Sequence, residues 1–188
     1  MEQQSYSIMQ INPNPWPYIV ADDLVPKSFV DQLARHAELL ITNKKFGLHA
    51  FNSDNFGTEL LNEYHQVEAY LRSRELEILN YFPQHRTYKQ LDFSAHLAVQ
   101  PAGYSYPTHC EHPSKIISYV TYVSPEHSVG TAIHATATDS PLFTVDWQVG
   151  RSLIFAGLND ITWHSYASGA EPRVTFLCFS VDSGFSSV

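Results

Sequence analysis

The chain has 188 residues, of which 44% are hydrophobic and 16% charged, a composition typical of a globular protein and not of a disordered one. Its formal net charge is −8, and Lys44 and Lys45 are its only adjacent basic pair, so a nucleic-acid-binding surface is not expected. No apolar run approaches the roughly 20 residues needed to cross a bilayer, so no membrane partner is expected. An acidic chain of this kind is expected to act on a small molecule or on another protein.

The two cysteines, Cys110 and Cys178, are expected to be free thiols. The first ten residues lack the basic and apolar regions of a secretory signal. Disulfides are rare in the cytosol, where thiols are kept reduced. The sequence therefore predicts a cytoplasmic protein.

The N-terminal part of the chain favours two helices. A proline-rich opening leads into a short strand over 18–21, because each proline pushes the residue before it toward extended geometry. Apolar residues with helical spacing then predict a helix over 26–42, for which Ser28 is a candidate cap. A loop over 48–57 separates it from a second amphipathic helix over 57–80. The apolar stripes consist of Phe29, Leu33, Ala37 and Leu40 in the first helix, and of Leu60, Leu61, Tyr64, Val67, Tyr70 and Leu71, continued by Leu76 and Leu79, in the second.

Beyond residue 90 the pattern changes to short β-rich runs, most of them separated by Gly, Pro, Ser or Asn. Close spacing of such strands, with little helix between them, indicates an all-β sandwich or a double-sheet jelly roll. The expected fold is therefore mainly β with α, with the N-terminal helices packed on one sheet face. The length fits a single domain, 1–188, with helical support over 1–90 and a catalytic core over 91–182. The predicted strands are 92–99, 115–123, 130–137, 142–147, 151–157 and 173–181.

The segment YPTHCEHPSK contains the first candidate metal ligands, His109 and Glu111. They are two residues apart, and alternate residues of a strand point to the same face. The best candidate for a third ligand is His164, in a polar loop after the strand over 151–157. Two histidines and one carboxylate on one side of an ion form the facial triad of non-haem Fe(II) oxygenases, which leaves positions open for substrate and dioxygen.

Other ligands remain open at this point. His112 points away from Glu111 if the strand is regular. His96 and His134 lie within predicted strands, where a lone histidine is more often packed or hydrogen-bonded than bound to a metal. Cys110 alternates away from the ligand face and is interpreted as a packing residue.

Arg173 is an independent signal for an anionic ligand. It opens a strand that carries no other charge before Asp182, and it shares a strand face with Thr175. If that face points inward, the arginine needs a partner, because burying an unpaired charge is costly. A guanidinium can bind a carboxylate through two parallel hydrogen bonds, and Thr175 can add a hydroxyl donor. In the absence of an evident acidic partner on neighbouring strands, the sequence points to the carboxylate of a ligand.

The order His109-x-Glu111, then His164, then Arg173 resembles that of the Fe(II)/2-oxoglutarate-dependent dioxygenases, and of their prolyl-hydroxylase-like branch in particular. The fold of that family is the double-stranded β-helix, a variant of the jelly roll. The segment NPWPYIVADDLVP resembles the family's N-terminal entry, and QPAGYSYPTHCEHPSKIISYVTYVSP resembles its first ligand region. The resemblance covers most of the chain and is strongest over 92–181.

This resemblance implies a set of roles. His109, Glu111 and His164 would bind Fe(II), and Arg173, Thr175 and Tyr122 would bind the distal carboxylate of 2-oxoglutarate. Two positions depart from the family pattern: the carboxylate ligand is Glu111, where Asp is commoner, and Gln100 stands where the family often has a Tyr. The presence of a carboxylate ligand argues against a halogenase, in which that position is vacant for halide.

The implied cofactors are Fe(II), 2-oxoglutarate as cosubstrate and O₂, and the resemblance also allows ascorbate. The implied reaction is hydroxylation of a C–H bond with release of succinate and CO₂, on an amino acid, a peptidyl residue or a small metabolite. Two alternatives remain. A cupin-type metalloenzyme would dispense with 2-oxoglutarate and use further histidines such as His96 or His134. A non-catalytic jelly-roll binding module would hold a ligand without a metal.

Overall fold

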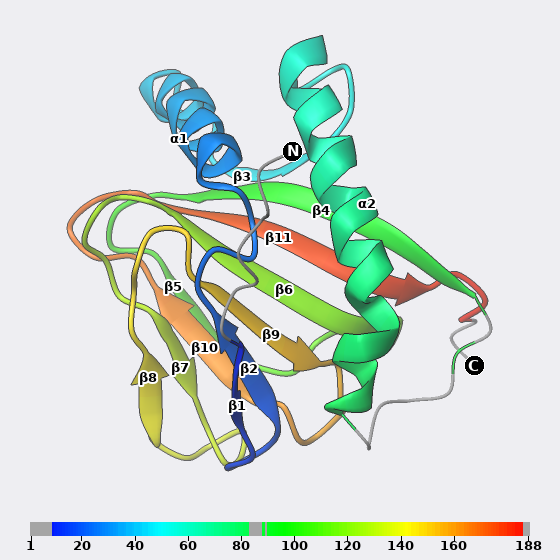
Figure 1. The fold of residues 1–188 in the computed structure, drawn as a ribbon. Helices are drawn as coiled ribbons and strands as arrows, with labels where there is room; N and C mark the ends of the chain where they lie inside the picture. The colour runs from blue at the N-terminus through cyan, green and yellow to red at the C-terminus, as the bar shows by residue number, and fades with distance from the viewer. Residues whose placement is uncertain (1–8, 83–87, 89, 186–188) are drawn as a thin grey trace.

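The computed structural model describes residues 9–82, 88 and 90–185. The predicted domain also includes 1–8, 83–87, 89 and 186–188, which lie outside the described residues. The described residues are mainly β, with two helices and two antiparallel sheets (Figure 1). The helices are α1 (Lys27–Thr42) and α2 (Thr58–Asn80).

The larger sheet has seven strands in the order β1-β2-β9-β6-β11-β4-β3, and the smaller has four in the order β5-β10-β7-β8. Non-consecutive strands are neighbours in both sheets, so residues far apart in sequence meet in space. The bounds are β1 (Met9–Asn12), β2 (Tyr18–Ala21), β3 (Gly47–Ala50), β4 (Leu91–Gln100), β5 (Ser105–His109), β6 (Lys115–Ser124), β7 (Thr131–Ile133), β8 (Phe143–Val145), β9 (Ser152–Ala156), β10 (His164–Ala167) and β11 (Arg173–Asp182).

The two predicted helices and the seven predicted strands, including the one over 18–21, are confirmed, most of them with differences at their ends. The strands predicted over 130–137 and 142–147 are shorter than expected, at Thr131–Ile133 and Phe143–Val145. The prediction of a loop over 48–57 was wrong for 48–50, which belong to β3 (Gly47–Ala50), an edge strand paired with β4. Four residues at a sheet edge carry too little periodic pattern to be recognised from sequence.

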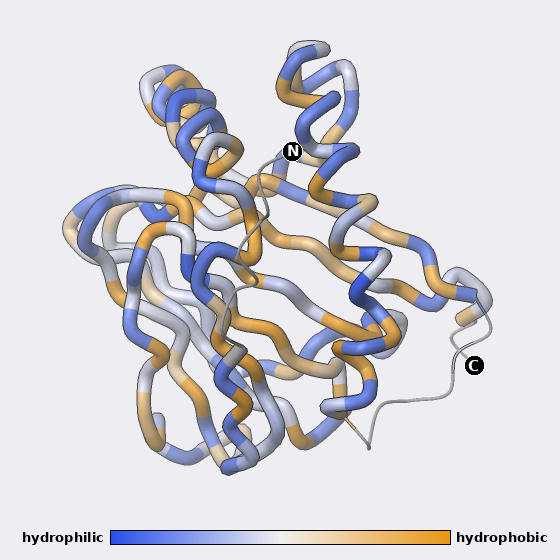
Figure 2. The backbone as a smooth tube through the Cα atoms, in the orientation of Figure 1, coloured by the Kyte–Doolittle hydropathy of each residue, from blue (hydrophilic) through white to orange (hydrophobic). Residues whose placement is uncertain are grey.

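Alternate residues of β11 face opposite sides of the larger sheet. Phe176 faces the helices: its ring centre lies 5.3 Å from that of Phe29 in α1 and 6.5 Å from that of Tyr64 in α2. Figure 1 shows α1 and α2 on this side of the sheet, and Figure 2 shows the hydrophobic stretches of the strands beneath them. Arg173 and Thr175 face the smaller sheet and contribute to the wall of a cavity. The strand thus separates a helix-covered core from a site between the sheets.

Replacement of Phe176 by alanine is expected to lower the free energy of unfolding by about 3–5 kcal/mol, because it leaves a cavity among packed aromatic rings. Phe176 is 1% exposed. Leu76→Ala on α2 is the control, since this side chain is 71% exposed and its loss should cost less than about 0.5 kcal/mol. Chemical denaturation measures both values, and equal losses in the two variants would contradict this view of the core.

On the opposite side of the sheet, a second apolar cluster closes the space between the two sheets at one end. Trp16 and Phe155 pack there with ring centres 5.6 Å apart, and Tyr18 reaches Phe143 of the smaller sheet at the same distance. This cluster seals the sheets together on the side of β2 and β9. The remaining space between them lies toward β4, β5 and β11.

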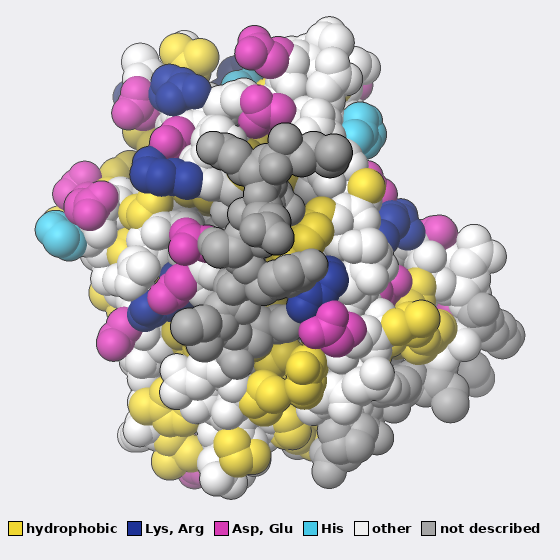
Figure 3. All heavy atoms as spheres, in the orientation of Figure 1, with side chains coloured by type: hydrophobic (Ala, Val, Ile, Leu, Met, Phe, Trp, Pro, Cys, Tyr) yellow, Lys and Arg dark blue, Asp and Glu magenta, His cyan; other side chains and the backbone are white. Residues whose placement is uncertain are grey.

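None of the described helices is both long enough and apolar enough to span a membrane. On the face drawn in Figure 3, the Lys and Arg side chains of the described residues lie apart from one another, with acidic side chains among them. Both cysteines are free thiols, as predicted, and Cys178 is fully buried.

Candidate active site

A cavity of about 980 Å³ lies between the two sheets. Its floor is the inner face of β4 and β11, and its opposite wall comes from β5, β10 and the loop that follows β5. Five of the sequence-predicted site residues line it: His109, Glu111, His164, Arg173 and Thr175.

The three candidate metal ligands come together at this cavity. His109 and His164 are partners in the register of β5 and β10, and their ring centres lie 4.2 Å apart. Nε2 of His164 lies 3.8 Å from Oε1 of Glu111. Strand pairing and a loop thus bring together ligands that are far apart in the sequence.

Two details of the local structure differ from the prediction. β5 ends at His109, so Glu111 lies in the following loop and not on the same strand. His164 is the first residue of β10 and not a loop residue.

The loop that carries Glu111 lies close to the end of β9, where Gly157 donates its N–H to Ile116 O at 3.0 Å. A Cβ on Gly157 would lie 2.2 Å from the carbonyl oxygen of Lys115, so this close approach requires glycine.

Both histidine rings are oriented by backbone carbonyls. Nδ1 of His109 donates to Pro107 O, and Nδ1 of His164 donates to Thr162 O, each at 2.9 Å. With the proton on Nδ1, each Nε2 carries a lone pair, which is the tautomer that a metal ligand needs. Burial, and then the neighbouring His109, lower the pKa of His164 to about 4, so its imidazole is neutral at physiological pH.

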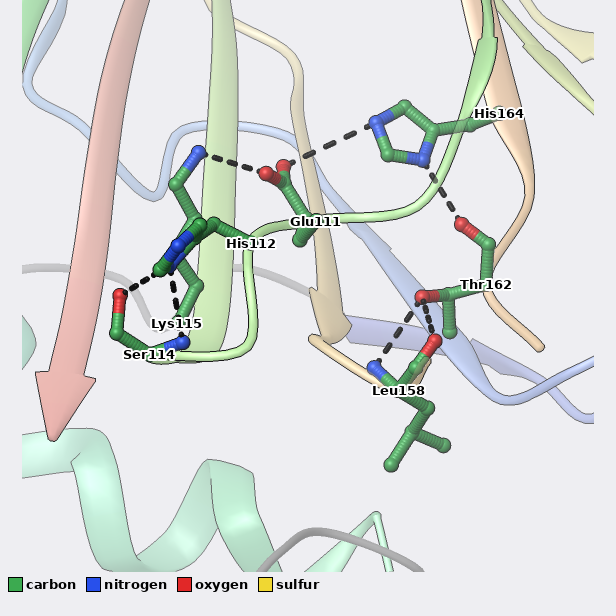
Figure 4. Close-up of polar contacts among 7 residues, drawn as sticks. All are labelled: Glu111, His112, Ser114, Lys115, Leu158, Thr162 and His164. Atoms are coloured by element: carbon green, nitrogen blue, oxygen red, sulfur yellow. Dashed lines mark hydrogen bonds and ion pairs between the residues drawn. The ribbon is translucent and has the colours of Figure 1, made fainter. Parts of the chain in front are cut away.

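Glu111 is held as a carboxylate between two cationic or polar neighbours. Its side chain is 9% exposed, and its Oε2 accepts a hydrogen bond from Nζ of Lys115 at 2.6 Å. Burial opposes ionisation, but Lys115 and then His164 outweigh it, and the pKa of Glu111 is lowered. Figure 4 shows the carboxylate between these two residues, with Oε1 turned toward His164.

Among the described residues, no group of three or more His, Cys, Asp or Glu side chains is placed so that it could hold a metal ion as it stands. The donor set nevertheless fits Fe(II), which binds imidazole nitrogen and carboxylate oxygen. Both Nε2 atoms are available by tautomer, and Oε1 of Glu111 is free of the Lys115 contact. Two histidines and one carboxylate oxygen would hold the ion on one side.

The other end of the cavity has an unpaired buried cation. Arg173 is 1% exposed, and its Nε and Nη2 have no hydrogen-bond partner among the described residues. Burial lowers the pKa of its guanidinium, and its Cζ lies 4.5 Å from the ring centre of Tyr166. Oγ1 of Thr175 and Oε1 of Gln100 are also buried without a hydrogen-bond partner in the part of the chain that the structure describes. Gln100 pairs with Arg173 in the register of β4 and β11. A buried guanidinium of this kind is suited to the carboxylate of a ligand.

Tyr122 differs from what the resemblance implies. Its hydroxyl donates to Oγ1 of Thr131 and accepts the N–H of Thr131, both at 3.0 Å. Its ring stacks on Trp147 with centres 4.5 Å apart. Tyr122 is fully buried and is not among the residues that line the cavity. The hydroxyl is therefore engaged with β7 of the smaller sheet. Thr131 and Tyr166, and not Tyr122, line the cavity.

The alternative histidine ligands lie elsewhere. Nδ1 of His112 contacts Oγ of Ser114 at 2.9 Å, away from the triad (Figure 4). His134 is buried, with its two ring nitrogens 2.9 Å from Asp139 O and from Oγ of Ser165. His96 lines the same cavity, but its Nδ1 has no hydrogen-bond partner among the described residues. Sequence reasoning missed Lys115 and Tyr166; the regular spacing of Lys115 four residues after Glu111 was the only available signal for the first.

The sequence matches no protein-family model, and no curated protein resembles it in sequence. Solved structures do resemble it in three dimensions. A prolyl-4-hydroxylase from Pseudomonas putida aligns with a TM-score of 0.65 and 15% identity over 89% of this chain and 93% of the other. The chain has a prolyl-hydroxylase fold.

Two further structures support the same fold. A viral collagen prolyl hydroxylase from Paramecium Bursaria Chlorella virus-1 has a TM-score of 0.59 and 15% identity, over 96% of this chain and 97% of the other. A prolyl hydroxylase from Trichoplax adhaerens, solved with a hypoxia inducible factor peptide fragment, has a TM-score of 0.59 and 12% identity, over 88% and 83%. In each case the similarity covers most of this chain.

Proposed function

We propose that this protein is an Fe(II)- and 2-oxoglutarate-dependent dioxygenase. It would hydroxylate a C–H bond of an amino acid, a peptidyl residue or a small metabolite and release succinate and CO₂. The observation that carries the proposal is the fully buried guanidinium of Arg173, whose Nε and Nη2 have no hydrogen-bond partner among the described residues, in the same cavity as His109, Glu111 and His164. The fold shared with prolyl hydroxylases supports it.

In this proposal each residue has one task. His109, Glu111 and His164 hold Fe(II), which supplies activation of O₂ when bound. Arg173 and Thr175 hold the distal carboxylate of 2-oxoglutarate, and Tyr122 acts indirectly by fixing Thr131. Thr162 and Pro107 keep both imidazoles in the required tautomer. We also propose a single domain with its catalytic core over 91–182, and a cytoplasmic location.

The structure favours this function over the two alternatives. In a cupin-type site, His134 would be an additional ligand, but both of its nitrogens are within hydrogen-bonding distance of protein groups. A non-catalytic binding module would not need three candidate ligands with two imidazoles held in matching tautomers. A cupin-type enzyme that does not use 2-oxoglutarate gives no role to the buried guanidinium of Arg173.

The proposal is tested by anaerobic titration of the protein with Fe(II) and 2-oxoglutarate. We expect one weak visible charge-transfer band that saturates at one equivalent of each, because the keto acid would chelate the bound metal. Succinate is the control, since it lacks the keto group and should produce no band. The absence of a band with 2-oxoglutarate at saturating concentrations would refute the proposed function.

A further inference from the structure

The cavity continues beyond the triad, away from Arg173. The order of the residues along the cavity follows from their contacts. Tyr166 packs on Arg173, and His164 lies two positions before Tyr166 on β10. His164 faces Glu111, and Glu111 binds Lys115. Arg173, the triad and Lys115 therefore follow one another along the cavity, and 2-oxoglutarate bound to Arg173 would leave the end at Lys115 open.

Lys115 is fixed at this end of the cavity by two contacts. Its Nζ lies 2.6 Å from Oε2 of Glu111 and 3.6 Å from the ring centre of Phe179. An ammonium group has three donors, and the contact with Glu111 uses one of them. The side chain is 25% exposed, so the group can accept a further partner from the cavity.

Two neutral donors lie on the strands beside Lys115. His96 and Ser94 face the cavity from β4 and pair with Leu177 and Phe179 of β11. Nδ1 of His96 is buried and has no hydrogen-bond partner among the described residues. Burial, and then the charge of Lys115, lower the pKa of His96, so the ring can donate one hydrogen bond as a neutral imidazole.

The charged groups that would meet in the cavity sum to a net positive charge. Its lining contains the cations Arg173 and Lys115 but only one acidic residue, Glu111. A divalent metal and dianionic 2-oxoglutarate would cancel each other, and Glu111, which contacts Lys115 at 2.6 Å, offsets only one of the two cations. One positive charge is then in excess in a partly buried place, where uncompensated charge is unfavourable.

We propose that Lys115, His96 and Ser94 form a subsite for a carboxylate of the substrate, next to the triad and opposite Arg173. This inference rests on the proposed function and narrows its substrate class to molecules that carry a free carboxylate. Phe179 and Val181 supply an apolar floor to the same subsite, so the acid also carries an apolar portion. A single shared ammonium suits a monoanionic carboxylate better than a dianionic phosphate.

The test uses protein loaded with Zn(II), as a redox-inert metal, and 2-oxoglutarate. The probes are N-acetyl-L-phenylalanine and its amide, together with an acetylated tetrapeptide ending in the same residue, as acid and as amide. We expect the acid to bind at least about tenfold more tightly than the amide in one or both pairs, because it gains a charge-assisted hydrogen bond. The pair that shows the preference tells whether a small acid or a chain terminus is accepted.

Substitutions in the subsite test whether its residues cause the preference for the acid over the amide. Lys115→Met and His96→Ala should each lower the affinity for the acid by about tenfold and leave the amide unchanged. Lys27→Met is the matched control, because it removes the same charge from a side chain that is 81% exposed on α1. His96→Ala does not touch Glu111 and so separates the subsite from any effect on the metal.

Equal binding of acid and amide in both pairs, no binding of either acid, or an acid preference that survives in both variants would overturn the inference. Binding of Zn(II) and 2-oxoglutarate is measured by calorimetry in the same samples. If it is absent, the proposed function itself fails; if it is intact while the acid preference is missing, only the carboxylate subsite fails.

Discussion

His164→Ala is expected to reduce 2-oxoglutarate-dependent succinate formation to the level seen without Fe(II). The side chain is 4% exposed, and its Nε2 faces both the carboxylate of Glu111 and the ring of His109. Its removal leaves one imidazole and one carboxylate, which is too few to hold the ion on one side with positions open for 2-oxoglutarate. His109→Ala should have the same effect. Succinate release under saturating Fe(II) measures both.

The matched control is His112→Ala. This imidazole is close to Glu111 in sequence but contacts Ser114, so its loss should leave succinate formation within about twofold of the parent, as expected for a residue outside the triad. Circular dichroism checks that each variant is folded. Unchanged succinate formation in His164→Ala or His109→Ala would show that the triad is not the metal site.

Much of this arrangement could be predicted from the sequence, because it depends on strand periodicity. Alternation along a strand places Arg173 and Thr175 on one face and Phe176 on the other, as the structure shows. The spacing of apolar residues likewise predicted both helices. Such patterns depend only on which face of an element is buried.

The rest depends on contacts between segments that no local pattern records. Glu111 occupies its place because its loop lies against Gly157 and Lys115, not because it shares a strand with His109. The sequence-based prediction assigned the hydroxyl of Tyr122 to a ligand, but the packing of the two sheets brings Thr131 within hydrogen-bonding distance of it. Hydrogen-bond partners of buried polar groups are set by tertiary structure, and so the polar site was predicted less completely than the core.

Arg173→Met is expected to raise the KM for 2-oxoglutarate by about 10- to 150-fold, as a bidentate charge-assisted contact contributes roughly 1.5–3 kcal/mol. The same change should alter the free energy of unfolding without 2-oxoglutarate by only about 1 kcal/mol. Losing the contacts between the guanidinium and the aromatic rings destabilises the fold, but removing a buried charge stabilises it by a comparable amount. These opposite expectations distinguish a ligand-binding arginine from a structural one, which would destabilise the fold on removal.

Arg173→Lys refines the same prediction. It keeps the positive charge but loses the planar fork, so its KM for 2-oxoglutarate should lie between those of the parent and Arg173→Met. The KM is measured from succinate release at saturating Fe(II), and the unfolding free energy from chemical denaturation. An unchanged KM in Arg173→Met, together with a loss of several kcal/mol in stability, would assign Arg173 to the fold. Tyr166 and Trp147, whose ring centres lie 4.5 Å and 5.2 Å from its Cζ, would then be its structural partners and not the wall of a carboxylate site.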